Sequence, residues 1–289
     1  MVQLHKYALT VLLLLFALIT LFPIVLTVTG SFMTEREIGL NYDLIGNMTS
    51  ADGGPQGQFV NWKLVPDWVT LEQFRNVLID SPTFLLRFWN SMMLVAPIIA
   101  GQTIVASLAA FALANLRLPG KDALFLVYIV AMLMPFQVTL VPNYIMADEL
   151  GILNRAAAIV LPGIFAPFGV FLLRQFYLHI PSPIIEAARM DGAGYARIFL
   201  AIVLPLAKSG IAALVVLLFA DYWNMVEQPL VFIDDPLKHP LSVYLSRILE
   251  GERGVGFAAS LLYMSPVILL FLYAETYFVQ GIQSSGIKG

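Results

Sequence analysis

Long apolar blocks, separated by shorter polar segments, dominate the pattern along the 289-residue chain. Six blocks come close to or exceed the roughly 20 apolar residues that a helix needs to cross the hydrocarbon core of a bilayer. They lie at about 7–30, 88–114, 122–142, 156–176, 209–226 and 258–282. The apolar residues in these blocks are consecutive and follow neither the alternating pattern of a strand nor the heptad pattern of a coiled coil. We therefore expect an all-α polytopic membrane protein with six transmembrane helices, built as a single transmembrane domain over residues 1–289.

Several of the blocks contain proline, which does not have to end a membrane helix. Neighbouring helices and waters can pair the carbonyl groups that a proline leaves free. We therefore expect kinks rather than helix ends at six prolines that lie inside these blocks. They are Pro23, Pro97, Pro135, Pro162, Pro167 and Pro266.

The even number of spans predicts that both termini lie on one side of the membrane. With that side assigned to the cytoplasm, the 16 Lys and Arg residues divide equally between inner and outer segments. The inner segments are shorter, and basic residues orient a chain mainly through short loops near span ends. We expect both termini in the cytoplasm, extracytoplasmic loops at 34–83 and 228–257, and a cytoplasmic loop at 182–205.

Composition and charge exclude several classes of function. Hydrophobic residues make up 59% of the chain and charged residues 12%, whereas soluble domains carry about 25% charged residues. The formal charge of −3 argues against a nucleic-acid partner bound through bulk positive charge. The chain has no Cys and only three scattered His, so it lacks the usual metal-ligand spacings. No nucleotide-binding loop or hydrolase motif occurs, and we expect a non-enzymatic chain without a bound cofactor or metal.

The inner loop carries the strongest local signal. Ser182 followed by Pro183 is typical of a helix start, and Glu186 falls where the helix dipole favours an anion. Glu186 and Arg189 have the i,i+3 spacing of an ion pair. Gly192 suits the left-handed cap that ends a helix. The pattern predicts two short helices joined at Gly192. Three apolar residues of the first helix could enter a groove on a partner: Ile184, Ile185 and Ala188.

The same loop resembles the signature of a known family. Residues 186–193 read Glu-Ala-Ala-Arg-Met-Asp-Gly-Ala, and Ile202-x-Leu204-Pro205 follows. This spacing resembles the interior loop of ABC importer permeases, in their carbohydrate-uptake, maltose-type branch. Weaker likenesses agree with it: Trp-Asn and Pro-Leu within 223–230, Leu-Pro-Gly-Lys at 118–121, and a tail of small residues at 281–289. The resemblance covers nearly the whole chain.

The resemblance implies a type I ABC importer permease fold and a shared transport mechanism. The chain would pair with a second homologous permease and receive a carbohydrate from an extracytoplasmic solute-binding protein. Two cytoplasmic ATPase subunits, which bind ATP and Mg, would dock underneath, and the tail at 284–289 would reach between them. Eight residues are implied to couple to the ATPase: Glu186, Ala187, Ala188, Asp191, Gly192, Ala193, Leu204 and Pro205.

Polar and aromatic residues are candidates for the solute pathway, because hydrogen bonds and stacking aromatics hold sugars. The candidates are Trp223, Asn224, Glu227, Gln228 and Gln137. The alternative for the same residues is helix packing, with Trp223 in an aromatic belt and Gln137 on a kinked packing helix. The end of the second outer loop is the candidate contact for the binding protein, or merely a turn. It comprises Gly251, Glu252, Arg253 and Gly254.

Two other interpretations of the whole chain stay open. Asp221 and Glu275 lie in apolar blocks, where ionisable residues usually face a cavity or a partner, so an ion-coupled transporter or channel is one alternative. Secondary transporters usually contain internal repeats, and the sequence shows no such repeat. A structural membrane partner without a pathway is the other alternative.

Overall fold

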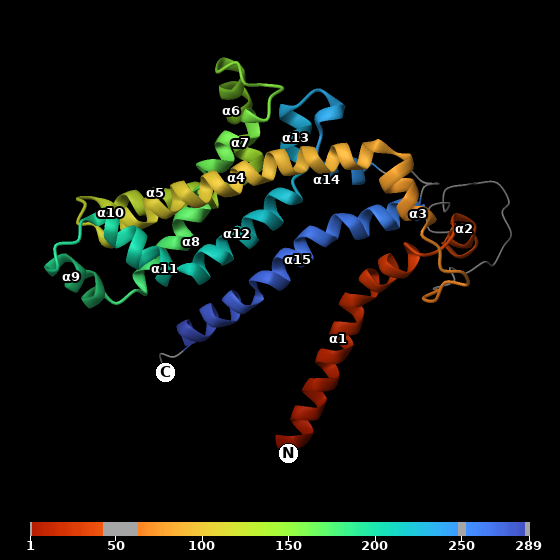
Figure 1. Cartoon of the computed structure of the whole chain (residues 1–289), viewed down its shortest axis with the longest axis horizontal. Helices are drawn as coiled ribbons and strands as arrows, with labels where there is room; N and C mark the ends of the chain where they lie inside the picture. Colours follow the sequence, from red (N-terminus) through yellow and green to blue (C-terminus); the bar gives the residue numbers. More distant parts are fainter. Residues whose placement is uncertain (1, 43–62, 248–252, 287–289) are drawn as a thin grey trace. The chain divides into compact units, whose positions relative to one another are not determined.

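A computed structural model describes residues 2–42, 63–247 and 253–286 of the chain. All regular structure among these residues is helical, as the apolar blocks predict. The described residues form two compact units (Figure 1). Unit 1 contains residues 1–86 and 244–266, and unit 2 contains residues 87–243 and 267–289.

Unit 1 is built on helix α1 (Val2–Gly30) and the short helices α2 (Glu35–Tyr42) and α3 (Glu72–Arg75). A π-helical turn (Asn76–Asp80) follows α3. The first residues of α4 (Pro82–Asn115) and the first half of α15 (Arg253–Gly286) complete the unit. Its small core contains Met33, Ile38 and Tyr42, against which Leu26 and Phe257 pack.

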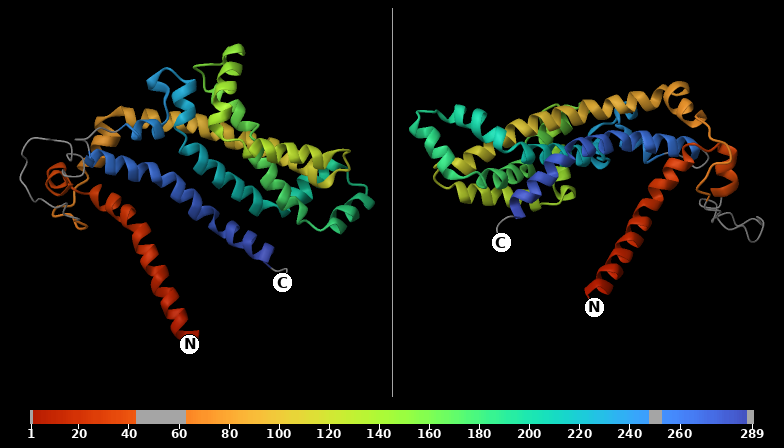
Figure 2. Two further views of the ribbon diagram at one scale, coloured as in Figure 1. Left: turned by 180° about the vertical axis from the view of Figure 1, so that it is seen from behind. Right: turned by 60° about the horizontal axis from the view of Figure 1, so that its bottom comes forward.

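Unit 2 contains most of α4 and the helices that follow it in the chain. These are α5 (Lys121–Leu133), α6 (Phe136–Glu149), α7 (Ala157–Ile164), α8 (Pro167–Leu178), α9 (Ser182–Met190), α10 (Tyr195–Ile198), α11 (Leu204–Leu206), α12 (Lys208–Trp223), α13 (Glu227–Phe232) and the start of α14 (Leu241–Leu245), whose end belongs to unit 1. A π-helical turn (Phe199–Val203) joins α10 to α11, and a 3₁₀ turn (Pro236–Lys238) precedes α14. Figures 1 and 2 show α8 between α5 and α12, and it packs on both.

Close packing of α8 depends on glycine at two points. A Cβ atom on Gly210 of α12 would lie 2.4 Å from the ring of Phe176 in α8. A Cβ atom on Gly169 of α8 would lie 2.8 Å from the Cβ of Ala106 in α4. Small residues let membrane helices approach closely, because little drives association in lipid apart from van der Waals packing and interhelical hydrogen bonds. These glycines therefore set how near α4 and α12 come to α8.

Within the described residues, four helical stretches are long and apolar enough to cross a membrane. They are Leu9–Gly30, Pro82–Asn115, Ala157–Leu178 and Arg253–Glu275. Two bent pairs of helices pass the same test together: α5 with α6, and Tyr195–Leu206 with α12. The total is up to six if each bent pair is one span, which agrees with the predicted number.

The prolines behave in two ways. Helices α1, α4, α7 and α15 continue past Pro23, Pro97, Pro162 and Pro266, as expected. The prediction is wrong for Pro135 and Pro167, which lie at helix starts. The residues before them, Met134 and Ala166, are extended, because a proline ring clashes with a helical conformation of the preceding residue. The break before Pro135 bends α5 and α6 by 99°.

Candidate functional site

The predicted coupling loop occupies one end of unit 2, and α13 lies toward the other end (Figure 1). Helix α9 starts at Ser182, and Pro181 occupies the N-cap position without a side-chain cap. Ser182 is therefore a helical residue rather than the predicted cap. Of the expected apolar face, Ile185 is buried against its own chain and Ala188 is half-buried, whereas Ile184 is exposed. Met190, 88% exposed, adds an apolar side chain to the outer surface of the loop.

Gly192 ends α9 as the sequence predicts. Its φ of +81° lies in the left-handed region, which an L side chain rarely adopts. The N–H of Gly192 donates to the carbonyl of Arg189 at 3.0 Å, and the N–H of Ala193 donates to the carbonyl of Ala188 at 2.9 Å. Together these two bonds form a Schellman motif. The motif turns the chain sharply between α9 and α10 and leaves the loop little freedom there.

The loop presents a polar outer surface around this turn. Glu186, Ala187, Asp191 and Gly192 are exposed, and Ala193 is half-buried. Further along, Leu204 is half-buried and Pro205 is exposed. The expected ion pair between Glu186 and Arg189 is not among the ion pairs of the described residues. The Arg189 guanidinium instead donates to the carbonyl oxygen of Asn115 at 3.3 Å, which leaves the Glu186 carboxylate open to a partner.

Two pathway candidates from distant parts of the sequence meet in the structure. Gln137, at the start of α6, donates through Nε2 to both carboxylate oxygens of Glu227, at the start of α13, at 3.2 and 3.4 Å. Both side chains are exposed. Because α6 begins at the break before Pro135, the bend between α5 and α6 places Gln137 at this contact. The pair has a donor amide and an acceptor carboxylate, the groups that bind hydroxyls.

The other pathway candidates are positioned differently. Trp223 is fully buried, with its ring 5.1 Å from that of Phe219 and 5.6 Å from that of Phe88. This packing favours the helix-packing alternative for Trp223 over contact with a solute. Asn224 is exposed and donates to the carbonyl of Ala220 in its own helix at 2.7 Å. Gln228 is half-buried, and its Oε1 is buried without a hydrogen-bond partner.

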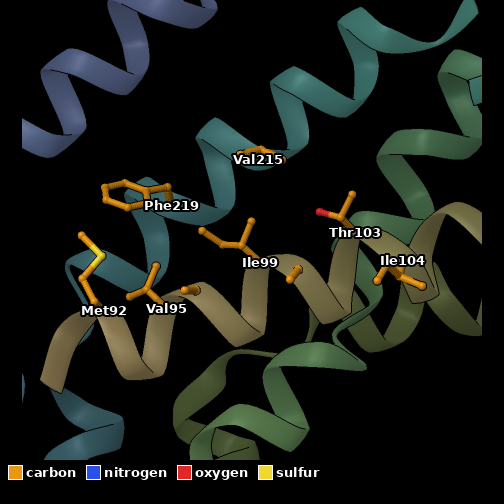
Figure 3. Close-up of a pocket in the computed structure, with 9 residues that line it drawn as sticks. Met92, Val95, Ile99, Thr103, Ile104, Val215 and Phe219 are labelled. Atoms are coloured by element: carbon orange, nitrogen blue, oxygen red, sulfur yellow. The ribbon is translucent and has the colours of Figure 1, made fainter. Parts of the chain in front are cut away.

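An open apolar groove of about 510 Å³ runs between α4 and α12 (Figure 3). Met92, Val95 and Ile99 line it from α4, and Val215 and Phe219 line it from α12. Thr103 is the one lining residue with a polar side chain. A sugar would find almost no hydrogen-bonding group here, and stripping water from its hydroxyls without replacement is costly. The solute pathway is therefore not assigned to this groove.

The candidate contact for a binding protein lies partly outside the described residues, which do not include Gly251 and Glu252. The Arg253 side chain donates to the backbone carbonyl of Tyr42. Gly254 is buried, and its N–H donates to the Glu35 carboxylate at 3.1 Å. The backbone of Gly254 thus already binds within the chain, and a contact of this segment with a binding protein stays a prediction.

The two acids of the alternative interpretation, Asp221 in α12 and Glu275 in α15, are both exposed. Neither takes part in an ion pair among the described residues. Within the same residues, no group of three or more His, Cys, Asp or Glu side chains could hold a metal ion. Among the side chains that the structure describes, no cluster of ion ligands thus surrounds Asp221 or Glu275.

Comparison with known protein families decides the class of protein. The family described as "Binding-protein-dependent transport system inner membrane component" matches residues 102–284. The chain belongs to this family. It is therefore a multi-pass, non-catalytic permease subunit of an ABC importer, and a separate ATPase subunit hydrolyses ATP.

Individual relatives of the permease are similar over most of its length. The arabinooligosaccharides transport system permease protein AraQ of Halalkalibacterium halodurans is 29% identical over 78% of this chain and 81% of its own. The sn-glycerol-3-phosphate transport system permease protein UgpE of Salmonella typhi is 32% identical over 77% of this chain and 83% of its own. A chain from the crystal structure of a bacterial ABC transporter involved in alginate import superposes with a TM-score of 0.78 at 23% identity, covering 96% of this chain and 97% of that one. This structural comparison shows that the two chains share a fold.

Sequence reasoning missed a polar network in unit 1 of the permease. The Glu37 carboxylate accepts the backbone N–H of Asp67 at 2.7 Å and pairs with the ammonium group of Lys63 at 3.1 Å. The Asp67 carboxylate hydrogen-bonds the same ammonium group and raises the pKa of Lys63, and burial raises the pKa of Tyr42. The Tyr42 hydroxyl donates to the carbonyl of Lys63 at 2.7 Å. Ordinary spacing rules did not single out these residues because the partners lie 21 and 30 residues apart in a segment without periodicity.

Proposed function

We propose that this permease forms half of the translocation pathway of a carbohydrate importer and couples to its ATPase through residues 182–205. One observation carries the proposal. The loop with the Glu-Ala-Ala signature folds into two helices held by the Gly192 motif, with the Glu186 side chain exposed at the surface. We call the two short helices α9 and α10, with the turn at Gly192, the knob. A rigid, exposed knob can transmit the displacement of a docked subunit to the membrane helices, whereas a flexible peptide would absorb it.

The carbohydrate class rests on the relatives. One acts in arabinooligosaccharide transport, and a structurally similar chain belongs to an importer of alginate, an acidic polysaccharide. The Gln137–Glu227 pair supports the proposal, since it supplies both a donor and an acceptor for sugar hydroxyls. We therefore assign Gln137, Asn224, Glu227 and Gln228 to the pathway, with an oligosaccharide as cargo.

The partners follow from the same proposal. A second homologous permease completes the pathway, two ATPase subunits bind ATP and Mg, and a solute-binding protein delivers the cargo. A second chain from an alginate ABC transporter, crystallised in complex with an alginate pentasaccharide-bound periplasmic protein, has a TM-score of 0.59 to this chain. We place both termini and the 182–205 loop in the cytoplasm, and we place the 228–257 loop, including Arg253, on the side of the binding protein.

The test is transport by the complete importer reconstituted in vesicles. Glu186→Lys reverses the charge on the exposed knob, so we expect ATP hydrolysis no longer to drive uptake although the chain still inserts. Glu149→Lys makes the same charge change on an exposed residue at the end of α6, outside the loop, and is expected to transport. Normal uptake by Glu186→Lys would overturn the coupling assignment.

A further inference from the structure

Arg189 connects the coupling loop to a membrane helix that is distant in the sequence. Its guanidinium donates to the carbonyl oxygen of Asn115, the last residue of α4, 74 residues away. Helix α4 is 34 residues long. The last carbonyl groups of a helix have no partner within it and carry the negative end of its dipole, so a cation is favoured there. Arg189 therefore caps the end of α4 from within α9.

The same guanidinium also contacts the second helix of the loop. Its central carbon lies 5.0 Å from the centre of the Tyr195 ring, within the range of a cation–π contact. Tyr195 is the first residue of α10, just beyond the Schellman motif at Gly192. One side chain thus joins three segments, namely the end of α9, the start of α10 and the end of α4.

The contact with α4 is only partly made. The Nε of Arg189, a donor, is buried without a hydrogen-bond partner, and so is the Oδ1 of Asn115, an acceptor. A buried donor or acceptor that is left unpaired destabilises the structure. These two atoms belong to the residues that the 3.3 Å bond already joins, and they are complementary. A small shift of the two side chains could pair the Arg189 Nε with the Asn115 Oδ1, and this second hydrogen bond would tighten the contact.

We propose that Arg189 is a positioning residue that makes α9 and the inner end of α4 move as one body. This inference rests on the proposed coupling function and adds a second route from the ATPase into the membrane. The loop joins α8 and α12 through the backbone, and Arg189 adds α4 through its side chain. Arginine suits this role because its planar fork can bond a carbonyl and lie over an aromatic ring at once.

The experiment measures the distance across the contact in the complete importer. The chain contains no Cys, so Arg117→Cys, two residues beyond α4, and Met190→Cys, on α9, can carry the only two spin labels on this subunit. Both positions are exposed. We expect a single narrow distance distribution, both without nucleotide and with ATP and vanadate. Adding Arg189→Ala should remove the narrow maximum.

Matched variants separate positioning from general loss of structure. Arg197→Ala removes an exposed guanidinium from α10 and is expected to keep the narrow distribution. Arg189→Lys keeps a cationic hydrogen-bond donor but loses the planar guanidinium group. It should therefore broaden the distance distribution less than Arg189→Ala does. If Arg189→Ala fails to assemble, Tyr195→Leu is measured in its place, and a broadened distribution is again expected.

The outcomes distinguish this inference from the function on which it rests. If ATPase subunits do not co-purify with the permease, the proposed function itself fails. If they co-purify and hydrolyse ATP while Arg189→Ala or its substitute keeps the narrow distribution in both states, the positioning role is overturned.

Discussion

At the scale of single residues, two neighbouring glycines of the coupling loop have different backbone requirements. Gly192 has a φ of +81°, whereas Gly194 has a φ of −72° that any residue can adopt. A Cβ atom at either position would meet nothing within 4 Å. Any difference between substitutions at the two sites therefore reports backbone conformation rather than crowding.

We predict that Gly192→Ala impairs coupling more than Gly194→Ala does. An L residue in the left-handed region costs roughly 1–2 kcal/mol, so the Schellman motif should open part of the time and loosen the knob. The number of ATP molecules hydrolysed per solute imported should rise more for Gly192→Ala. Equal ratios for the two variants would show that the left-handed turn is irrelevant to coupling.

Trp223 provides a second prediction at this scale. Because it is fully buried between Phe88 and Phe219, Trp223→Ala should lower the free energy of unfolding by about 3–5 kcal/mol. Thermal unfolding of the detergent-solubilised permease measures the loss. Trp223→Phe, which keeps an aromatic ring, should lose less stability and still support uptake. An unchanged unfolding temperature for Trp223→Ala would contradict the packed environment.

At the scale of helices, one break between α5 and α6 brings together Gln137 and Glu227, the polar pair that we propose for the pathway. The extended backbone at Met134 ends α5, and α6 leaves at 99°, so that Gln137 reaches Glu227. An unbroken helix over 122–142, as the apolar block predicted, would carry residue 137 in another direction. The irregular backbone is consistent with a pathway, since non-helical segments at membrane depth occur where they line a cavity or are buried in protein.

We predict that Glu227→Ala raises the KM of solute uptake. The loss of one hydrogen bond to a charged group, worth about 1.5 kcal/mol, corresponds to about tenfold. Glu149→Ala, an exposed acid at the other end of α6, should leave the KM unchanged. Should Glu227→Ala have a normal KM, the pair would be a structural contact between α6 and α13 rather than part of the pathway.

The contact between α8 and α12 gives a prediction about stability alone. Gly210→Val would place its side chain against the Phe176 ring, which a Cβ atom already approaches to 2.4 Å. Overpacking of this kind costs about 1–3 kcal/mol. Thermal unfolding should show the loss, and Gly194→Val, in open space, should show a smaller one. Similar unfolding temperatures for both variants would mean that α8 and α12 separate freely.

At the scale of the whole molecule, transport should require subunits that this chain does not contain. Vesicles with the permease alone should show no uptake under an ion gradient. Uptake should require the second permease, the ATPase subunits and ATP. Ion-driven uptake by the chain alone, abolished by Asp221→Asn or Glu275→Gln, would restore the alternative of a secondary transporter.

Much of the fold and part of the site follow from local sequence patterns. The helical spans follow from apolar blocks, and the Gly192 cap follows from one residue that tolerates a positive φ. The prediction for Pro135 was wrong because a proline can either kink a membrane helix or end it, and here the residue before it, Met134, has an extended backbone that ends α5. The sequence left two interpretations of Trp223 open, because its ring is compatible with stacking on a sugar and with stacking on Phe219.

The sequence by itself determined that the chain is helical and membrane-spanning and that the chain turns at Gly192, whereas the permease class and the coupling role of residues 182–205 were predicted from a family resemblance. Partition between lipid and water and backbone preferences act over a few residues, so a linear pattern contains them. Tertiary structure alone decided that Gln137 hydrogen-bonds Glu227, 90 residues away in the chain. It also decided that Arg189 donates to the carbonyl at the end of α4 rather than pairing with Glu186. Where a side chain points depends on which helix packs against its face, and that choice is made by contacts far apart in the chain.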